Sequence, residues 1–350
     1  LLSSQVKRDE LADLGLRFDL TVPLVRFYAH NMGSLPTPLK SIQIGPVWRA
    51  ESPQQGRFRQ FTQCDIDIIG VKSEAAETEL IHATSKALLE LGFKDFTVRI
   101  NDRRILTELA EFCEFSEDRF EVVFITLDKL DKIGLEGVRK ELNAVAHSGE
   151  ATDRLISILE AVMHSDDITH IISHLPQTLP TEVLHSLRNV IDTINETSGG
   201  HFKARFDPTL VRGMGYYTGQ IFEISAPGYS HSIAGGGRYD KMVGKFSGRD
   251  TPACGFSIGF ERIINILTEK GFRPASETKR IALIFEPDND PLNKVMTAAS
   301  HLRSDGSIVS TLPRKKDMRK QLDALFAQEF GHYCVFREEG LDVRQLGASK

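Results

Sequence analysis

The sequence predicts an α+β fold in three parts, and three observations lead to this prediction. Two runs rich in β-branched and aromatic residues flank a connector with Pro53 and Gly56, which indicates antiparallel strands joined by a loop. Residues 113–198 show helical periodicity and few glycines, as expected of a helical insertion. From Arg280 onwards, apolar strands and helices alternate as in a small parallel βαβαβ module.

Composition and charge are those of an ordinary globular protein. The 350 residues are 41% apolar and 26% charged, and such a length suits two or three domains. The formal net charge of -5 does not predict nucleic-acid binding, so any such contact has to come from local patches. The four cysteines lie far apart without a C-x-x-C pair, so no zinc or disulfide framework is visible and a reducing cytoplasm is expected.

Hydropathy and the first residue add two further expectations. No apolar run has the length of a membrane span and no signal peptide is recognisable, so we expect no membrane partner. The chain begins with Leu rather than Met, and we expect a fragment or a processed chain that lacks its N-terminal part.

The functional interpretation depends most on the stretch from Ile44 to Gly70. Gln63, Asp65 and Asp67 share one face of its second strand, because side chains alternate along a strand. The charged residues at the loop end of the hairpin are Arg49, Glu51, Arg57 and Arg59. A polyanion site beside a pocket for a cationic or donor-rich ligand would use these residue types. A solvated hairpin would also carry them, and the hairpin alone does not decide between the two.

The segments around the hairpin predict strands and helices in turn. Residues 16–22 alternate polar and apolar side chains as in a strand, and Pro23 suits the first turn of a following helix. A second helix ends at Gly92, and residues 96–101 have the pattern of a strand. The helical region 113–198 holds no cluster typical of catalysis, which favours a packing or partner-binding role.

Residues 205–262 return to strands with a high density of glycine. Arg212 and two adjacent tyrosines fall on a strand flanked by glycines. The glycine run 235–237 favours a β-bulge or tight turn; the alternative is a position where a ligand or another backbone approaches closely. A strand then leads into a helix that begins near Arg262.

The C-terminal module, residues 279–350, is mildly basic within an acidic chain. Five cations lie between its second strand and second helix: Arg314, Lys315, Lys316, Arg319 and Lys320. A solvated basic turn explains such a cluster, and phosphate binding is the sharper alternative.

Taken together, these stretches resemble the histidyl-tRNA synthetases, a family of class II aminoacyl-tRNA synthetases. Leu16–Leu24 (LRFDLTVPL) is similar to the family's amino-acid-binding strand, and Gly45–Asp67 to class II motif 2. Leu210–Gly219 (LVRGMGYYTG) and Gly235–Asp240 (GGGRYD) resemble the two signatures of the histidyl enzyme. Gly255–Arg262 resembles motif 3, and the shared order of all these motifs argues against coincidence.

The resemblance implies an antiparallel catalytic sheet flanked by helices, a helical insertion and an anticodon-binding-like α/β domain. The implied boundaries are 1–112 and 199–272 for the two parts of the catalytic core, 113–198 for the insertion and 279–350 for the last domain. Motif 1, which forms most of the family's dimer interface, is expected to precede residue 1, and a homodimer is expected of the full-length protein.

The resemblance further implies activation of histidine by ATP and transfer to tRNA(His), with Mg²⁺ shielding the phosphates and no protein-ligated metal. The catalytic residues would be Arg49, which holds the α-phosphate, and Arg212, which holds both the carboxylate and the α-phosphate. The implied ATP contacts are Arg49, Glu51, Arg57 and Arg262. The implied tRNA contacts are Gln54, Lys315, Lys316 and Arg319.

A second group of residues is implied to bind histidine. These are Asp19, Thr21, Gln63, Asp67, Arg212, Tyr216, Tyr217 and Tyr239. Within this group Asp19, Thr21 and Gln63 would bind the α-amino end. Asp67 and Tyr217 would hydrogen-bond the two imidazole nitrogens.

Three positions depart from the family pattern. Gly215 stands where Asp is common, Asp19 is shorter than the Glu of many bacterial members, and Ser52 replaces an Arg usual in bacterial motif 2. The alternative interpretation is a non-catalytic paralogue, either the regulatory subunit of the ATP phosphoribosyltransferase of histidine biosynthesis or a tRNA-sensing domain. That subunit typically lacks the anticodon domain and the ATP arginines, whereas this chain retains both, which favours the synthetase.

Overall fold

The computed structural model describes residues 14–50, 52, 58–146, 149–163, 165–211, 215–229, 232–272 and 278–347. The chain divides into two compact units, Leu1–Lys270 and Gly271–Lys350, each of which is treated by itself. All four cysteines are free. In the described part of the chain, no helix is both long and apolar enough to cross a membrane.

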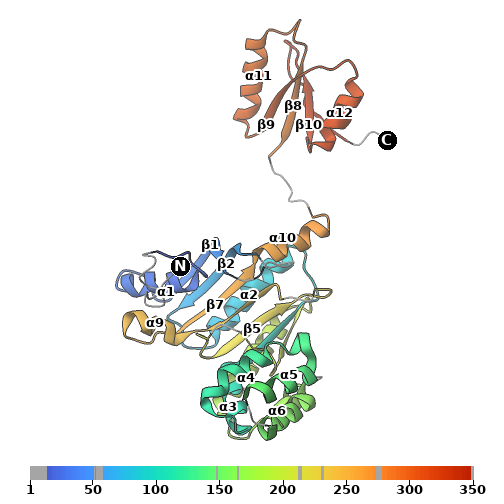
Figure 1. Cartoon of the computed structure of the whole chain (residues 1–350). Coiled ribbons are helices and arrows are strands. Elements are labelled where there is room, and N and C mark those ends of the chain that lie inside the picture. The colour runs from blue at the N-terminus through green and yellow to red at the C-terminus, as the bar shows by residue number, and fades with distance from the viewer. Residues whose placement is uncertain are drawn as a thin grey trace, which may run out of the picture. The chain divides into compact units, whose positions relative to one another are not determined.

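The first unit is built on a seven-stranded sheet with the order β1-β2-β7-β6-β5-β3-β4 (Figure 1). Neighbouring strands run antiparallel except β3 and β4, which are parallel. The strands are β1 Leu39–Trp48, β2 Gln60–Ile69, β3 Thr97–Asp102, β4 Lys203–Phe206, β5 Gln220–Ser225, β6 Ala234–Arg238 and β7 Ala253–Gly259. The predicted α+β class with a large antiparallel sheet is therefore confirmed.

Helices cover the sheet and fill the long connection between β3 and β4. They are α1 Thr21–Asn31, α2 Ala75–Glu90, α3 Arg103–Phe112, η2 Glu117–Arg119, α4 Phe120–Leu127, α5 Leu130–Ala146, α6 Gly149–Val162, α7 Ile168–His174, α8 Thr181–Thr197, α9 Asp240–Ser247 and α10 Phe260–Glu269. The helices from η2 to α8 lie within the predicted insertion 113–198. The limits of that insertion as a separate domain stay a prediction.

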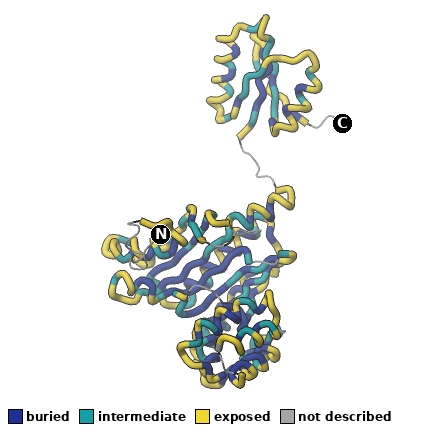
Figure 2. The backbone as a smooth tube through the Cα atoms, viewed as in Figure 1, coloured by how far each residue is buried: buried dark blue, intermediate teal, exposed yellow. Residues whose placement is uncertain are grey.

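A small hydrophobic core packs α1 against α9, and two larger cores hold together the rest of the first unit. One lies between the sheet and α2, α8 and α10, where Leu80, Leu187 and Phe256 are buried together. The other lies among the helices of the insertion and includes Leu210 and Val211 from the segment after β4. Figure 2 shows these buried residues as dark blue strands and helix faces. Because apolar side chains on one sheet face are taken up by helices, the alternate side chains of the strands are left to the opposite face.

The central hairpin is present as predicted. β1 and β2 pair antiparallel, with Gln43 opposite Asp65 and Ser41 opposite Asp67. The strand predicted over residues 16–22 is wrong. Asp19 accepts a 3.1 Å hydrogen bond from the Val22 amide instead, and so helix α1 begins at Thr21 with Pro23 in its first turn, as predicted for that proline.

The sequence favoured a bulge or a turn for the glycine run 235–237, and this prediction is wrong. The run is the middle of the buried strand β6. A Cβ atom on Gly236 would lie 2.0 Å from the carbonyl oxygen of Gly255, so the close backbone approach of β7 requires glycine there. The prediction that Tyr216 and Tyr217 lie on a strand is also wrong. Tyr216 lies in a turn and Tyr217 follows it, both before β5 begins at Gln220.

The second unit is a small α/β module of four strands in the order β11-β10-β8-β9. Its elements are β8 Arg280–Phe285, α11 Leu292–Ser304, β9 Ile308–Pro313, α12 Met318–Ala327, β10 His332–Val335 and β11 Arg344–Gln345. The predicted parallel pairing of β8 with β9 and β10 is confirmed. α11 packs with Leu283 and α12 with Ile284, on opposite faces of β8. The antiparallel strand β11 is too short for a sequence pattern to predict.

Candidate functional site

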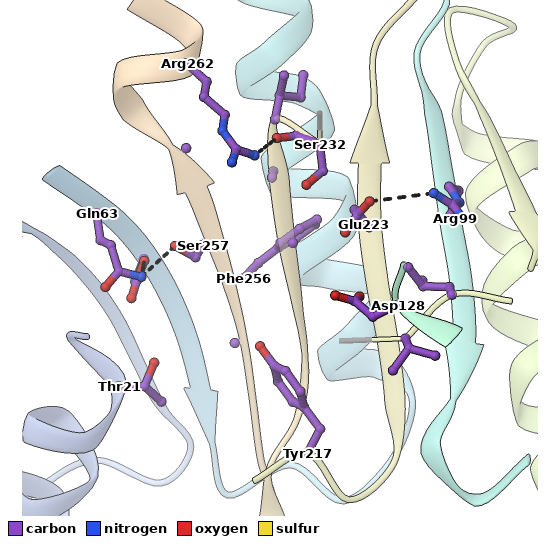
Figure 3. Close-up of a pocket in the computed structure, with 18 of the residues that line it drawn as sticks. Thr21, Gln63, Arg99, Asp128, Tyr217, Glu223, Ser232, Phe256, Ser257 and Arg262 are labelled. Atoms are coloured by element: carbon purple, nitrogen blue, oxygen red, sulfur yellow. Dashed lines mark hydrogen bonds and ion pairs between the residues drawn. The ribbon is translucent and has the colours of Figure 1, made fainter. Parts of the chain in front are cut away.

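A cavity of about 780 Å³ crosses the face of the seven-stranded sheet. In Figure 3, Thr21 and Gln63 lie on one side of it, and Arg99 and Glu223 lie on the other. Strands β2, β7, β6, β5 and β3 all contribute side chains, and the connection between α4 and α5 adds more. The cavity therefore spans the five inner strands of the sheet.

Three buried polar side chains on one wall of the cavity, and Asp19 close to them, each have an acceptor oxygen without a hydrogen-bond partner among the described residues. Asp19, Gln63, Asp65 and Asp67 are between 1% and 7% exposed. Because buried acceptors are nearly always paired in proteins, this wall is suited to a ligand that brings several donors.

The remaining hydrogen bonds of this wall hold the side chains in place. The Tyr239 phenol donates to Oδ1 of Asp67 at 2.6 Å, and Nε2 of Gln63 donates to Oγ of Ser257 at 3.0 Å. Gly255 allows this arrangement, since a Cβ atom there would lie 2.1 Å from Oδ1 of Asp67. Strand β7 thus provides both a partner for Gln63 and the space for Asp67.

Burial and mutual repulsion perturb the carboxyl groups. Burial raises the pKa of Asp65 to about 6, although the hydrogen bond with Ser257 lowers it in part. Burial also raises the pKa of Asp67 to about 7; the Tyr239 hydrogen bond opposes this rise, and the charges of Asp65 and Asp19 add to it. The pKa of Asp19 is raised by burial as well. A bound cation would relieve this strain on the charged forms.

Three tyrosines form the floor next to this wall. The rings of Tyr216 and Tyr217 lie 4.8 Å apart, and those of Tyr216 and Tyr239 lie 6.2 Å apart, both edge to face. Burial raises the pKa of Tyr239 well above its ordinary value, so its hydroxyl stays a donor to Asp67. A flat polar ring would fit between an acceptor and a hydroxyl here.

Guanidinium groups lie beyond the acidic wall. Arg49 follows β1, donates to the Phe18 carbonyl at 3.1 Å and lies 4.9 Å from the centre of the Phe61 ring. Arg262, in the first turn of α10, donates to the Ser232 carbonyl. Figure 3 shows it on β7's side of the cavity, away from Tyr217. The cavity therefore offers acceptors at one end and cations with an aromatic ring at the other, which suits a zwitterion beside a nucleotide.

The structure brings together eight of the residues singled out from the sequence around this cavity. They are Thr21, Arg49, Gln63, Asp67, Tyr216, Tyr217, Tyr239 and Arg262, with Asp19 close to Asp67 and Arg49. Four others lie outside the described residues: Glu51, Gln54, Arg57 and Arg212. In the part of the chain that is described, no group of three or more His, Cys, Asp or Glu side chains is arranged to hold a metal ion.

The basic cluster belongs to the second unit. Lys315 and Lys316 connect β9 to α12, and Arg319 lies in the first turn of α12; all three are exposed. Asp317 caps the helix by accepting from the Lys320 amide at 3.1 Å. Arg314 pairs with Glu286 at 2.7 Å, so it contributes less free charge than the sequence suggested.

Sequence reasoning gave no role to several residues that line the cavity. Asp65 was placed on the correct face, yet no specific contact followed from it. Arg99, Asp128, Asp131 and Glu223 form the far side, and no motif contains them. Their positions depend on how the insertion folds back onto the sheet, which periodicity does not reveal.

Comparisons with known proteins show which sequences and folds this chain resembles. The family model described as histidyl-tRNA synthetase matches residues 5–263. A histidine–tRNA ligase of Leifsonia xyli subsp. xyli is 44% identical over 345 residues, covering 96% of this chain and 79% of that protein. The crystal structure of a histidyl-tRNA synthetase from Nostoc sp. PCC 7120 is 27% identical, with a TM-score of 0.76 and coverage of 94% of this chain and 79% of that one.

A more distant structure shares the fold alone. It is described as an ATP phosphoribosyltransferase regulatory subunit/histidyl-tRNA synthetase from Bacillus halodurans C, and it is 22% identical with a TM-score of 0.70. The match covers 92% of this chain and 80% of that one.

Proposed function

The chain belongs to the histidyl-tRNA synthetase family, and on that premise we propose that it activates histidine with ATP and transfers it to tRNA(His). The observation that carries the proposal is the cavity itself. Buried acceptors at one end face the tyrosines, and arginines lie at the other end, so one amino acid and one nucleotide fit side by side.

The acidic wall is the proposed histidine site. Asp19, Thr21 and Gln63 bind the α-ammonium group, since the unpaired oxygens of Asp19 and Gln63 accept its hydrogen bonds. Asp67 and Tyr217 hold the two imidazole nitrogens, one as acceptor and one as hydroxyl partner. Tyr239 orients Asp67, and Tyr216 closes the floor beneath the ring.

The arginine end is the proposed nucleotide site. Arg49 binds the α-phosphate, where negative charge builds up as the histidine carboxylate attacks in line. Arg262 binds the outer phosphates, and Phe61 offers a face on which the adenine stacks. By family resemblance, Glu51, Arg57 and Arg212 complete the contacts: Glu51 at the adenine, Arg57 at the outer phosphates and Arg212 between the carboxylate and the α-phosphate. Magnesium enters with ATP, because this hard cation prefers phosphate oxygens and water.

Histidine-dependent exchange of pyrophosphate into ATP tests the proposal directly. We expect exchange with histidine and none with other amino acids, and Arg49→Ala lowers it about a hundredfold, as for loss of one preorganised charged donor. Arg26→Ala is the matched control, because Arg26 is exposed on α1. Absence of exchange in the wild-type chain, with histidine and ATP still bound, would contradict the proposal.

A non-catalytic paralogue is the second candidate, and its support is the shared fold with the Bacillus halodurans protein. The presence of Arg49 and Arg262 at one cavity argues for catalysis, because a subunit that only senses histidine needs no phosphate-binding arginines. Binding of histidine without ATP would favour this alternative.

The other proposed partners concern surfaces outside the cavity. In the second unit, Lys315, Lys316 and Arg319 contact the phosphates of the tRNA. By family resemblance alone, Gln54 contacts its acceptor end. A homodimer is proposed because the edge strand β1 exposes Ile42 and Ile44 by 68% and 65%. The reaction would take place in the cytoplasm, where its substrates are found.

A further inference from the structure

Arg99 lies on β3 at the far side of the cavity, across the sheet from the proposed histidine site. Its Nε donates to Oδ2 of Asp207 at 2.7 Å, and its Nη1 donates to Oδ2 of Asp131 at 2.9 Å. The same Nη1 lies 3.7 Å from Oε1 of Glu223 on β5, as the dashed line in Figure 3 indicates. One guanidinium thus joins three carboxylates from three different segments of the chain.

Asp207 links Arg99 to the segment that follows β4. Its Oδ1 accepts from the Thr209 amide at 3.0 Å and from the Thr209 hydroxyl at 2.6 Å, so the carboxylate closes a tight turn. Leu210 and Val211 come next and line the cavity. Burial alone would raise the pKa of Asp207, but the neighbouring Arg99 lowers it, which keeps the carboxylate charged.

Asp131 links Arg99 to the helical insertion. It lies in the first turn of α5, in a run that lines the cavity together with Leu127, Asp128 and Lys132. The Asp131 side chain is 68% exposed, so its ion pair adds little to overall stability. The important effect of the Arg99–Asp131 ion pair is that it holds Asp131 in the cavity wall.

We propose that Arg99 is a positioning residue, which fixes residues 207–211 and 127–132 against each other as one wall of the cavity without touching the substrate. Its effect on turnover rests on the proposed function. With the wall loosened, histidine and ATP still bind at β2 and β7, but the reacting groups are held less well. The loss therefore falls on kcat and leaves KM nearly unchanged.

Three variants of the whole chain test the proposal. Arg99→Lys keeps the charge but cannot reach two carboxylates at once, and Asp131→Asn removes only the link to the insertion. Asp166→Asn is the matched control: Asp166 also ties the insertion to the sheet, through Lys203 and Arg205, at a similar exposure of 59%, but it does not line the cavity. Removal of the whole Arg99 side chain is avoided, because it would leave the buried Asp207 with Arg205, at 3.2 Å, as its remaining ion-pair partner among the described residues.

Hydrogen exchange measures the positioning without any assay of activity. We expect Arg99→Lys to speed exchange at the amides of Thr209 and Leu210 and of Lys132 and Ile133, all of which are hydrogen-bonded. Asp131→Asn should affect only the second pair, and Asp166→Asn neither. Equal exchange in wild type and Arg99→Lys would overturn the proposal.

Kinetics of pyrophosphate exchange test the effect on turnover. We expect kcat to fall about tenfold for Asp131→Asn and further for Arg99→Lys, with both KM values within about twofold of wild type. Asp166→Asn should match wild type. Faster hydrogen exchange with an unchanged kcat would overturn the proposed effect of Arg99 on turnover. If the wild-type chain has no exchange activity, the proposed function fails, and the hydrogen-exchange result still decides the role of Arg99.

Discussion

The phenol of Tyr239 donates a 2.6 Å hydrogen bond to the carboxylate of Asp67, although the two lie 172 positions apart in the sequence. Strand β2 supplies the acceptor and the residue directly after β6 supplies the donor, across β7. The bond occupies one oxygen of Asp67 and leaves the other free of partners among the described residues. The free oxygen is the one that we assign to the imidazole of histidine.

Loss of the Asp67 charge should weaken histidine binding and spare ATP. Asp67→Asn keeps the size of the side chain but removes the acceptor that favours an N–H on the imidazole. Tyr239→Phe leaves Asp67 without its donor and should weaken histidine binding less. Titration calorimetry of each ligand measures both effects, and an equal loss of ATP affinity would point to a folding defect instead.

The buried carboxyls should make the ligand-free chain less stable as the pH rises. The pKa values of Asp65 and Asp67 are about 6 and about 7 when folded, against 3.8 as the ordinary value, so the folded state holds more protons between these limits. Stability therefore falls as the pH increases from about 4 to 7 through these groups. Thermal unfolding of wild type and of Asp65→Asn at pH 5 and pH 7.5 measures this. We expect the Asn substitution to be more favourable at pH 7.5, and no difference between the two pH values would refute the assignment.

A methyl group in the middle of β6 should prevent correct packing of the sheet. In Gly236→Ala the new carbon would meet the backbone of β7, which cannot retreat as a flexible side chain would. We expect a loss of about 3 kcal/mol or more in the free energy of unfolding. Gly33→Ala is the control, since nothing lies within 4 Å of a Cβ atom there. Denaturant unfolding of both variants provides the comparison.

Removal of the exposed cations of the second unit should weaken tRNA binding and its dependence on salt. For the combined substitution of Lys315, Lys316 and Arg319 by Ala, the slope of log affinity against log salt should fall by about one unit for each phosphate that the variant no longer neutralises. Pyrophosphate exchange needs no tRNA and should stay at the wild-type rate. An unchanged slope would place the RNA-binding surface elsewhere, with the insertion as the next surface to test.

Patterns within single elements were predictable from the sequence. The alternation along β2 put Gln63, Asp65 and Asp67 on one face, and the structure has them there, because the period of a strand is fixed by its backbone. The same holds for the parallel module after Arg280, whose helices and strands each have a clear apolar period.

Features that depend on distant partners were not predictable. Residues 16–22 have the alternation of a strand, but they form no strand of the sheet: helix α1 begins at Thr21, and Asp19 accepts from the Val22 amide. The glycine run looked like a turn because its reason, the approach of β7, lies about twenty residues further along the chain. The far wall of the cavity, from Arg99 to Asp131, likewise arises only when the insertion packs on the sheet.

The parallel pairing of β3 with β4 has a consequence for how this chain varies and folds. Thr97 lies opposite Lys203, so the polypeptide leaves the sheet and re-enters it at adjacent strands, with helices in between. Loop-closure entropy grows only with the logarithm of length, about 0.6 kcal/mol for each doubling, so lengthening or shortening this excursion is thermodynamically cheap. The cost lies in the folding rate, because strands so far apart in the sequence pair late. Until the intervening helices pack and β4 pairs with β3, the edge of β3 stays unpaired.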